Sequence, residues 1–193
     1  VLGYLGYHQF VQKPKEVSAD NEMYYPRQYF DQALNSTTEK DSLYNLALNG
    51  AEGKYGFLDI IDEYKGTKAA NLANYSVGMA YLNMQKYQDA ITYLEKFSSD
   101  DAILGALAKG GIGDAFMQLN QPKDALGYYE KAISHSTNDY TTPRFLYKAG
   151  VTALELKQND KALEHFQKIK DEFPSSEEAR SVDAFIGMAK GGE

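Results

Sequence analysis

A repeating skeleton of small and large apolar residues constrains this chain more than any other feature. Each copy has a glycine, an aromatic residue or alanine three positions later, an alanine twelve after the glycine, and a large apolar residue four further on. The glycines are 35 residues (113 − 78) and 37 residues (150 − 113) apart, and the alanines keep these separations. Such a period is typical of helix pairs that are too small to bury their apolar faces alone and therefore stack. The three copies are Gly78, Tyr81, Ala90, Leu94; Gly113, Phe116, Ala125, Tyr129; and Gly150, Ala153, Ala162, Phe166.

This pattern resembles the tetratricopeptide repeat, in which helix A carries a small residue that lets helix B approach closely. The copies run over 71–104, 106–139 and 143–176, and Pro174 closes the third as a proline often does in that family. The third copy departs from the pattern, because Ala153 stands where an aromatic residue is usual. The resemblance covers residues 67–190 and implies an all-α, right-handed α-α superhelix that mediates protein–protein interaction.

Helical periodicity supports the same architecture without the resemblance. Apolar residues recur at helical spacing over 69–84 and over 86–97, and neither stretch contains a proline. Pro122 and Pro143 are both expected near the first turn of a helix, where a missing N–H costs least.

The flanks of the repeats are predicted to be helical as well. Residues 17–66 are expected to form a polar helix over 18–34 followed by a degenerate pair of short apolar helices. At the other end, Ser175 and Glu178 have the spacing of a capping box and predict a final helix over 176–190. A terminal helix with a polar outer face keeps a stack of repeats soluble.

Composition excludes several functions. The net charge is −7 over 193 residues, and no cluster of Lys and Arg is present, so nucleic acid is not expected as a ligand. The chain has no cysteine, which excludes thiol catalysis, thiolate metal sites and disulfides. Absence of cysteine is compatible with the cytosol and with an oxidising cell envelope.

The N-terminal residues 1–16 have two readings. They open VLGYLGYHQFV, too short to cross a bilayer, with Lys13 and Lys15 following the aromatic residues. This order is similar to the exit end of a membrane anchor with its interfacial aromatics, which we favour. The alternative is an amphipathic helix that docks on the first repeat.

A second resemblance concerns the order of elements. An anchor end, a polar helix, an irregular pair and several repeats resemble the ancillary subunits of the bacterial Sec translocon. The segment HFQKIKDEFPSSEEAR is similar to the repeat endings of periplasmic cell-division coordinators. These resemblances imply a bacterial inner-membrane protein whose soluble part faces the periplasm, with translocon or envelope-assembly proteins as partners; a cytoplasmic location is the alternative.

Catalytic and metal-binding constellations are not expected. His8, His135 and His165 lack a partner at i, i+4 spacing, so no helical metal pair is formed. The glycines of Gly110–Gly113 follow no strand and lack the Lys-Ser/Thr pair of a phosphate loop. Paired acids such as Asp100 and Asp101 are explained by helix N-termini, which favour negative charge. We therefore expect no enzyme, no cofactor and no metal site.

The resemblance also implies a binding groove lined by the A helices. The family positions that face this groove are Leu72, Tyr75, Met79, Leu82, Leu107, Asp114, Met117, Arg144, Tyr147, Val151 and Leu154. The predicted groove is apolar, with methionine and tyrosine anchors that suit an amphipathic helix or an extended peptide. Alternatively, some of these residues pack against the N-terminal helices, which would then lie in the groove.

The predicted function is that of a protein-binding adaptor, an accessory of secretion or envelope assembly. Family members that bind the C-terminal carboxylates of chaperones have Lys and Asn at two groove positions. Those positions are Tyr75 and Met79 here, so chaperone tails are not expected as partners. The alternative function is a self-associating structural module, in which Tyr-rich helix faces pair two copies of the chain.

Overall fold

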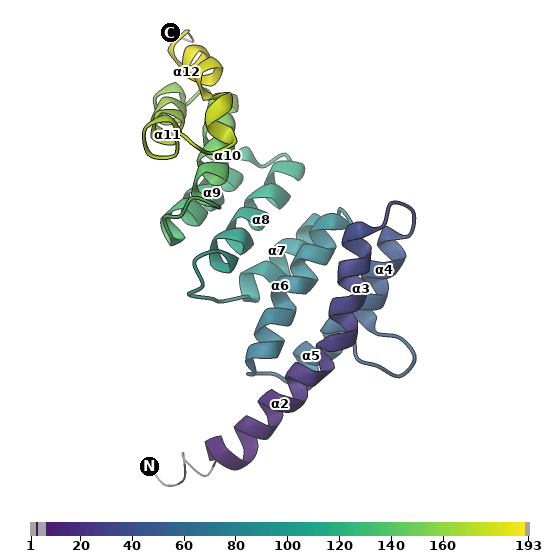
Figure 1. The fold of residues 1–193 in the computed structure, drawn as a ribbon. Coiled ribbons are helices and arrows are strands. Elements are labelled where there is room, and N and C mark those ends of the chain that lie inside the picture. Colours follow the sequence, from purple (N-terminus) through teal and green to yellow (C-terminus); the bar gives the residue numbers. More distant parts are fainter. Residues whose placement is uncertain (1–2, 4–6, 192–193) are drawn as a thin grey trace. The chain divides into compact units, whose positions relative to one another are not determined.

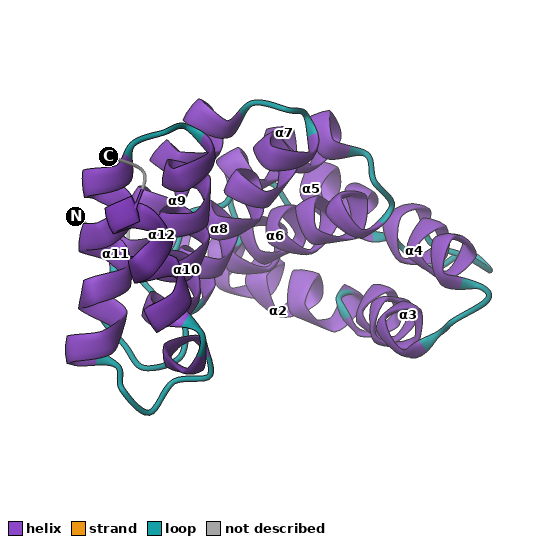
Figure 2. Cartoon of the chain, turned by 90° about the horizontal axis from the view of Figure 1, so that it is seen from above, coloured by secondary structure: helices purple, strands orange, loops and turns teal. Residues whose placement is uncertain are grey.

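The computed structural model describes Gly3 and residues 7–191 and divides into two compact units, Val1–Phe97 and Ser98–Glu193. The described residues form helices and no β-strand, apart from an isolated bridge between Ala51 and Lys54 (Figure 2). Consecutive helices pack in pairs within each unit, which confirms the all-α fold of stacked helix pairs predicted from the repeats.

The N-terminal unit contains a short π-helix, an irregular set of helices and the first repeat (Figure 1). Its elements are η1 (His8–Gln12), α2 (Lys13–Glu22), α3 (Tyr24–Asn35), α4 (Lys40–Asn49), α5 (Phe57–Glu63), α6 (Lys68–Asn83) and α7 (Tyr87–Lys96). The strongest packing is between α6 and α7 and between α3 and α4, and α5 packs against α6.

The single helix predicted over 18–34 is wrong, because the structure has two helices that meet at Met23. Pro26 explains the break, since its ring excludes the carbonyl of Glu22 from the helical hydrogen-bond ladder. Met23 is fully buried at this junction, so the elbow between α2 and α3 is held in the core of the unit. The degenerate pair predicted after this helix is present as α4 and α5.

Aromatic side chains fill the core of the N-terminal unit. Tyr44 and Phe57 are fully buried, and the ring of Phe30 meets both edge-on at centroid distances of 5.3 and 6.2 Å. The loop after α4 turns at Gly50, whose φ of +73° and contact with the carbonyl of Lys54 leave no room for a Cβ atom.

The C-terminal unit contains the second and third repeats and the terminal helices. Its elements are α8 (Leu104–Gln118), α9 (Pro122–His135), α10 (Thr142–Glu155), α11 (Asn159–Glu172), the 3₁₀ turn η2 (Glu178–Arg180) and α12 (Val182–Gly191). Helices α8 and α9 form one closely packed pair, and α10 and α11 form the other. Asp101 accepts hydrogen bonds from the amides of Ile103 and Leu104 (2.9 and 2.7 Å), as expected for an acid at the N-terminus of a helix. These hydrogen bonds lower the pKa of Asp101.

The terminal helix differs from the prediction at its start. α12 begins at Val182 rather than at residue 176, and a 3₁₀ turn precedes it. The amide of Ala179 donates to Ser176 Oγ (3.2 Å), so Ser176 caps this turn in place of the predicted Ser175–Glu178 box.

The repeated glycines lie where two helices approach most closely. A Cβ atom on Gly78, Gly113 or Gly150 would fall 2.5–2.6 Å from the side chain of Leu94, Tyr129 or Phe166 respectively. Two further glycines of α8 make room for other side chains. Gly105 faces the ring of His135, and Gly110 faces the ring of Phe145. The glycine pattern seen in the sequence is therefore a pattern of helix contacts.

A second repeated feature was not predicted. The second residue after each A helix adopts a left-handed backbone conformation, with φ between 57° and 60° at Gln85, Asn120 and Lys157. The next amide then donates back to the helix, as Gln158 N does to the carbonyl of Ala153 (2.8 Å). None of the three is glycine, which is why residue type did not reveal the turn.

Candidate partner-binding surfaces

The predicted groove residues of the second and third repeats lie on α8 and α10, whose side chains contact each other. The ammonium of Lys148 pairs with the carboxylate of Asp114. The hydroxyl of Thr152 points to the sulfur of Met117 at 3.7 Å. We call the surface formed by these two helices the A-helix face.

Asp114 is the polar centre of the A-helix face. It accepts a hydrogen bond from the hydroxyl of Tyr129 (2.8 Å) as well as the ion pair from Lys148, and both charged side chains are about three-tenths exposed. The ammonium of Lys148 also lies 5.8 Å from the centre of the Tyr129 ring. Burial and the neighbouring Asp114 carboxylate raise the pKa of Tyr129 far above its usual value.

The apolar members of this face are half-buried. The predicted residues of this kind on α8 and α10 are Leu107, Met117, Tyr147, Val151 and Leu154, and all five pack against the core of the C-terminal unit. Tyr147 differs from the expected free anchor, because its ring packs edge-on against Phe166 and Phe185 at 6.2 and 5.3 Å.

A cavity of about 320 Å³ opens at the beginning of α10. Its lining residues are Arg144, Tyr147, Lys148, Glu177, Glu178 and Ser181. Arg144 is exposed, and its guanidinium lies 5.9 Å from the centre of the Phe145 ring. The cavity joins predicted groove residues to the turn before α12, which the sequence had not connected with binding.

The remaining predicted groove residues lie on α6 in the N-terminal unit. Leu72, Tyr75, Met79 and Leu82 are half-buried. Tyr75 packs against Phe97 at a ring distance of 5.2 Å, and Leu72 packs against the buried cluster that includes Ala19 and Met23.

The N-terminal helices contact α6 at its first turn. Glu16 accepts a hydrogen bond from the amide of Lys68 (3.0 Å), and Lys15 donates to the carbonyl of Lys65 (3.0 Å). These contacts lie at and just before the first turn of α6, and the alternative that the N-terminal helices lie in the groove stays a prediction.

Comparison with known families agrees with this geometry. The sequence profile of the tetratricopeptide repeat matches residues 75–140 and again residues 111–177, which together span more than half of the chain. The chain belongs to the tetratricopeptide repeat family. Proteins of this family generally mediate protein–protein interaction and are typically scaffolds without catalytic activity. No curated protein matches the chain.

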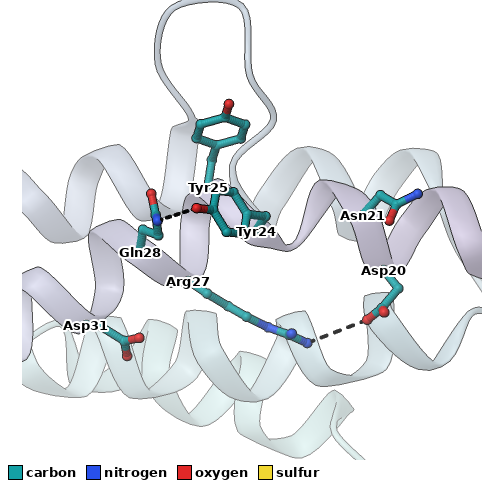
Figure 3. A pocket seen from close by; sticks show the side chains of 7 residues that line it. All are labelled: Asp20, Asn21, Tyr24, Tyr25, Arg27, Gln28 and Asp31. Atoms are coloured by element: carbon teal, nitrogen blue, oxygen red, sulfur yellow. Dashed lines mark hydrogen bonds and ion pairs between the residues drawn. The ribbon is translucent and has the colours of Figure 1, made fainter.

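A second cavity lies outside the tetratricopeptide repeat units, on the exposed side of α2 and α3 (Figure 3). It has a volume of about 560 Å³ and is lined by Asp20, Asn21, Tyr24, Tyr25, Arg27, Gln28 and Asp31. Arg27 reaches across the elbow to Asp20 (3.8 Å), and Gln28 donates to the hydroxyl of Tyr24 (2.8 Å). The sequence showed the tyrosines but not which side they occupy, because the break at Pro26 was missed.

Two histidines of this tetratricopeptide repeat protein, His135 and His165, lie in the C-terminal unit. His135 Nε2 lies 2.9 Å from the carbonyl of Asp101, which ties the end of α9 to the beginning of α8. His165 is half-buried, and burial lowers its pKa although Glu130 nearby opposes the shift. The side chain of His8 lies outside what the structure describes. Across the described residues, no group of three or more His, Asp or Glu side chains could hold a metal ion.

Part of the predicted membrane anchor, residues 1–2 and 4–6, lies outside the residues that the structure describes. Among the helices described, none combines the length and the apolar character that crossing a bilayer requires.

Proposed function

We propose that this chain is an adaptor that holds a protein partner on its A-helix face. The observation that carries the proposal is the contact between α8 and α10, in which Asp114 meets Lys148 and Met117 meets Thr152. These contacts unite the half-buried apolar side chains of both helices into one surface. Half-buried methionine, valine and leucine side chains gain burial when a partner helix or peptide covers them.

The cavity beside Arg144 gives this surface a polar end. An exposed guanidinium next to an apolar face suits a segment whose apolar residues are followed by a carboxylate side chain. Glu177 and Glu178 line the same cavity and would repel a partner with too many acids, which adds selectivity.

We further propose that the adaptor works in a bacterial envelope, tethered to the inner membrane and facing the periplasm, as an accessory of secretion or envelope assembly. Support comes from the order of elements in the sequence and from the aromatic N-terminal run followed by Lys13 and Lys15. Protease accessibility of a C-terminal tag in spheroplasts tests this location. Protection of the tag until the inner membrane is opened would place the repeats in the cytoplasm instead.

Site-specific photocrosslinking tests the A-helix face. A photoreactive residue at Val151, on α10, should crosslink to a translocon subunit or an emerging secreted chain in membranes. The matched control carries the same residue at Glu164, which is exposed on α11. Equal labelling from both positions would reject the A-helix face as the binding surface.

A charge reversal tests the role of Arg144. Arg144→Glu should reduce the Val151 crosslink about tenfold and leave the helical content unchanged, because Arg144 is exposed. The control is Lys131→Glu on α9, which is exposed as well. Undiminished crosslinking in Arg144→Glu would remove this residue from the proposed site.

A further inference from the structure

Exposed apolar side chains are concentrated on the N-terminal helices. Among the described residues, seven of the ten large apolar side chains that are exposed lie between Tyr7 and Leu34. The same helices bury Ala19, Met23 and Ala33 on their other side. Apolar residues on the outer side of a helix are unfavourable in water, and such a concentration marks an interaction surface.

Four of these seven apolar residues share a heptad pattern with four exposed charged residues. Starting at Phe10, successive positions are alternately three and four residues apart, which is the spacing of a coiled-coil seam. Every member is exposed, and Phe10, Val17, Tyr24 and Leu34 are 53–79% accessible. We call this set the N-terminal stripe, and its members are Phe10, Lys13, Val17, Asp20, Tyr24, Arg27, Asp31 and Leu34.

The middle of the N-terminal stripe is hollowed. Asp20 belongs to α2, whereas Tyr24, Arg27 and Asp31 belong to α3, and all four line the cavity of about 560 Å³ at the elbow (Figure 3). The stripe therefore presents one surface on both sides of the break at Met23, with room for side chains of another molecule.

We propose that the N-terminal stripe pairs with the same stripe of a second copy in antiparallel orientation. In antiparallel heptad packing each position of one set faces a position of the other set, and here the paired numbers add up to 44. Two-fold symmetry makes every pair occur twice. The resulting pairs are Phe10 with Leu34, Lys13 with Asp31, Val17 with Arg27, and Asp20 with Tyr24.

Charge complementarity selects this orientation. The antiparallel arrangement sets Lys13 against Asp31, lays the aliphatic stem of Arg27 on Val17, and brings the hydroxyl of Tyr24 to Asp20. A parallel arrangement would place Lys13, Asp20, Arg27 and Asp31 each against its own copy, which sets four like-charge pairs in contact. A second copy is thus a partner whose charges match this stripe in one orientation only.

Sedimentation of the full chain over a wide concentration range tests the pairing. We expect a concentration-dependent dimer that Asp31→Lys weakens about tenfold, because two lysine side chains would then face each other where Lys13 now meets a carboxylate. The double variant Lys13→Asp/Asp31→Lys restores the opposite charges and should dimerise as the original chain does. Glu164→Lys, an exposed acid on α11, is the control that should change nothing.

Engineered disulfides test the orientation, and the lack of any natural cysteine makes the result unambiguous. Val17→Cys/Arg27→Cys should form crosslinked dimers on oxidation, since the two positions face each other between copies. Val17→Cys alone should stay uncrosslinked, because the two copies of residue 17 would lie roughly 15 Å apart along the helix.

Two results would overturn the proposal. One is a chain that stays monomeric at several hundred micromolar, which would leave the stripe to a different protein partner. The other is efficient crosslinking of Val17→Cys to itself, which would demonstrate a parallel arrangement. Neither result bears on the A-helix face, because the Val151 crosslink reports on the C-terminal unit.

Discussion

The three repeats and the N-terminal helices bury their apolar surface by different means. In each repeat a glycine of helix A lies directly under a large side chain of helix B, as Gly150 lies under Phe166. The pair α3 and α4 instead relies on bulky rings, with Phe30 packed against Tyr44 and Phe57. In the repeats the lack of a side chain on helix A therefore sets the helix spacing, whereas between α3 and α4 the shapes of large side chains set it.

The largest effect should come from filling one of these glycine contacts. In Gly150→Ala the new Cβ atom would lie 2.6 Å from the ring of Phe166, which is fully buried and packed on Phe185. Because that ring has little room to move, we expect a loss of about 1–3 kcal/mol in the free energy of unfolding. Urea unfolding followed by circular dichroism measures it.

Gly127→Ala is the matched control for that experiment. Gly127 lies within α9, and a Cβ atom there would meet nothing within 4 Å. Since alanine is the better helix former, this variant should gain about 0.5–1 kcal/mol. Equal destabilisation of both variants would contradict the steric role of the repeat glycines.

Two buried tyrosines sharpen the comparison. Tyr129 donates to Asp114 in the repeats, whereas the hydroxyl of Tyr44 in the N-terminal unit is buried without a partner among the described residues. Tyr129→Phe should therefore lose about 1 kcal/mol, while Tyr44→Phe should be neutral or slightly stabilising. Thermal unfolding of both variants decides this, and a clear loss in Tyr44→Phe would reveal a partner for that hydroxyl.

The same tyrosines predict a pH dependence at the alkaline end. The pKa of each is raised by burial, so the unfolded chain loses these protons first. Stability is then intact below about pH 10, the usual tyrosine pKa, and falls as the pH rises above it. Tyr129→Phe should flatten this decline in a series of unfolding curves.

Glycine substitutions in the left-handed turns of the repeats should give a smaller gain in stability. Lys157 holds a φ of 58°, a conformation that glycine adopts without steric cost. Lys157→Gly should stabilise the chain by about 0.5 kcal/mol, and Asn120→Gly by less because asparagine tolerates this region. A loss of stability in Lys157→Gly would mean that its side chain contributes more than its backbone costs.

The smallest expected effect is a loss of stability at acidic pH. Burial lowers the pKa of His165, so the unfolded chain binds this proton more readily than the folded chain. Stability should therefore fall as the pH decreases from about 6.5, the usual histidine pKa, through the lowered value. His165→Gln should remove this part of the acid dependence, and an unchanged pH profile would exclude His165 as its source.

The sequence predicted those parts of the fold that depend on residue type at a fixed spacing. Gly78, Gly113 and Gly150 could be found because a close helix contact demands a small residue at the same place in every copy. The left-handed turns at Gln85 and Lys157 could not, since several residue types adopt that conformation at a modest cost.

The candidate surfaces were predicted less completely for the same kind of reason. Residue spacing placed Met117, Tyr147 and Val151 on A helices. It could not predict that the ring of Tyr147 packs against Phe185. The cavity on α2 and α3 depends on the helix break that Pro26 causes. Apolar periodicity does not reveal the effect of a single proline.

The glycines of α8 have a consequence for how the chain forms. Four of its fifteen residues are glycine, at positions 105, 110, 111 and 113, and each disfavours an isolated helix by about 1 kcal/mol relative to alanine. The rings that fit against three of them, those of His135, Phe145 and Tyr129, all come later in the chain. During synthesis we therefore expect α8 to be only weakly helical until α9 and the first turn of α10 have followed it.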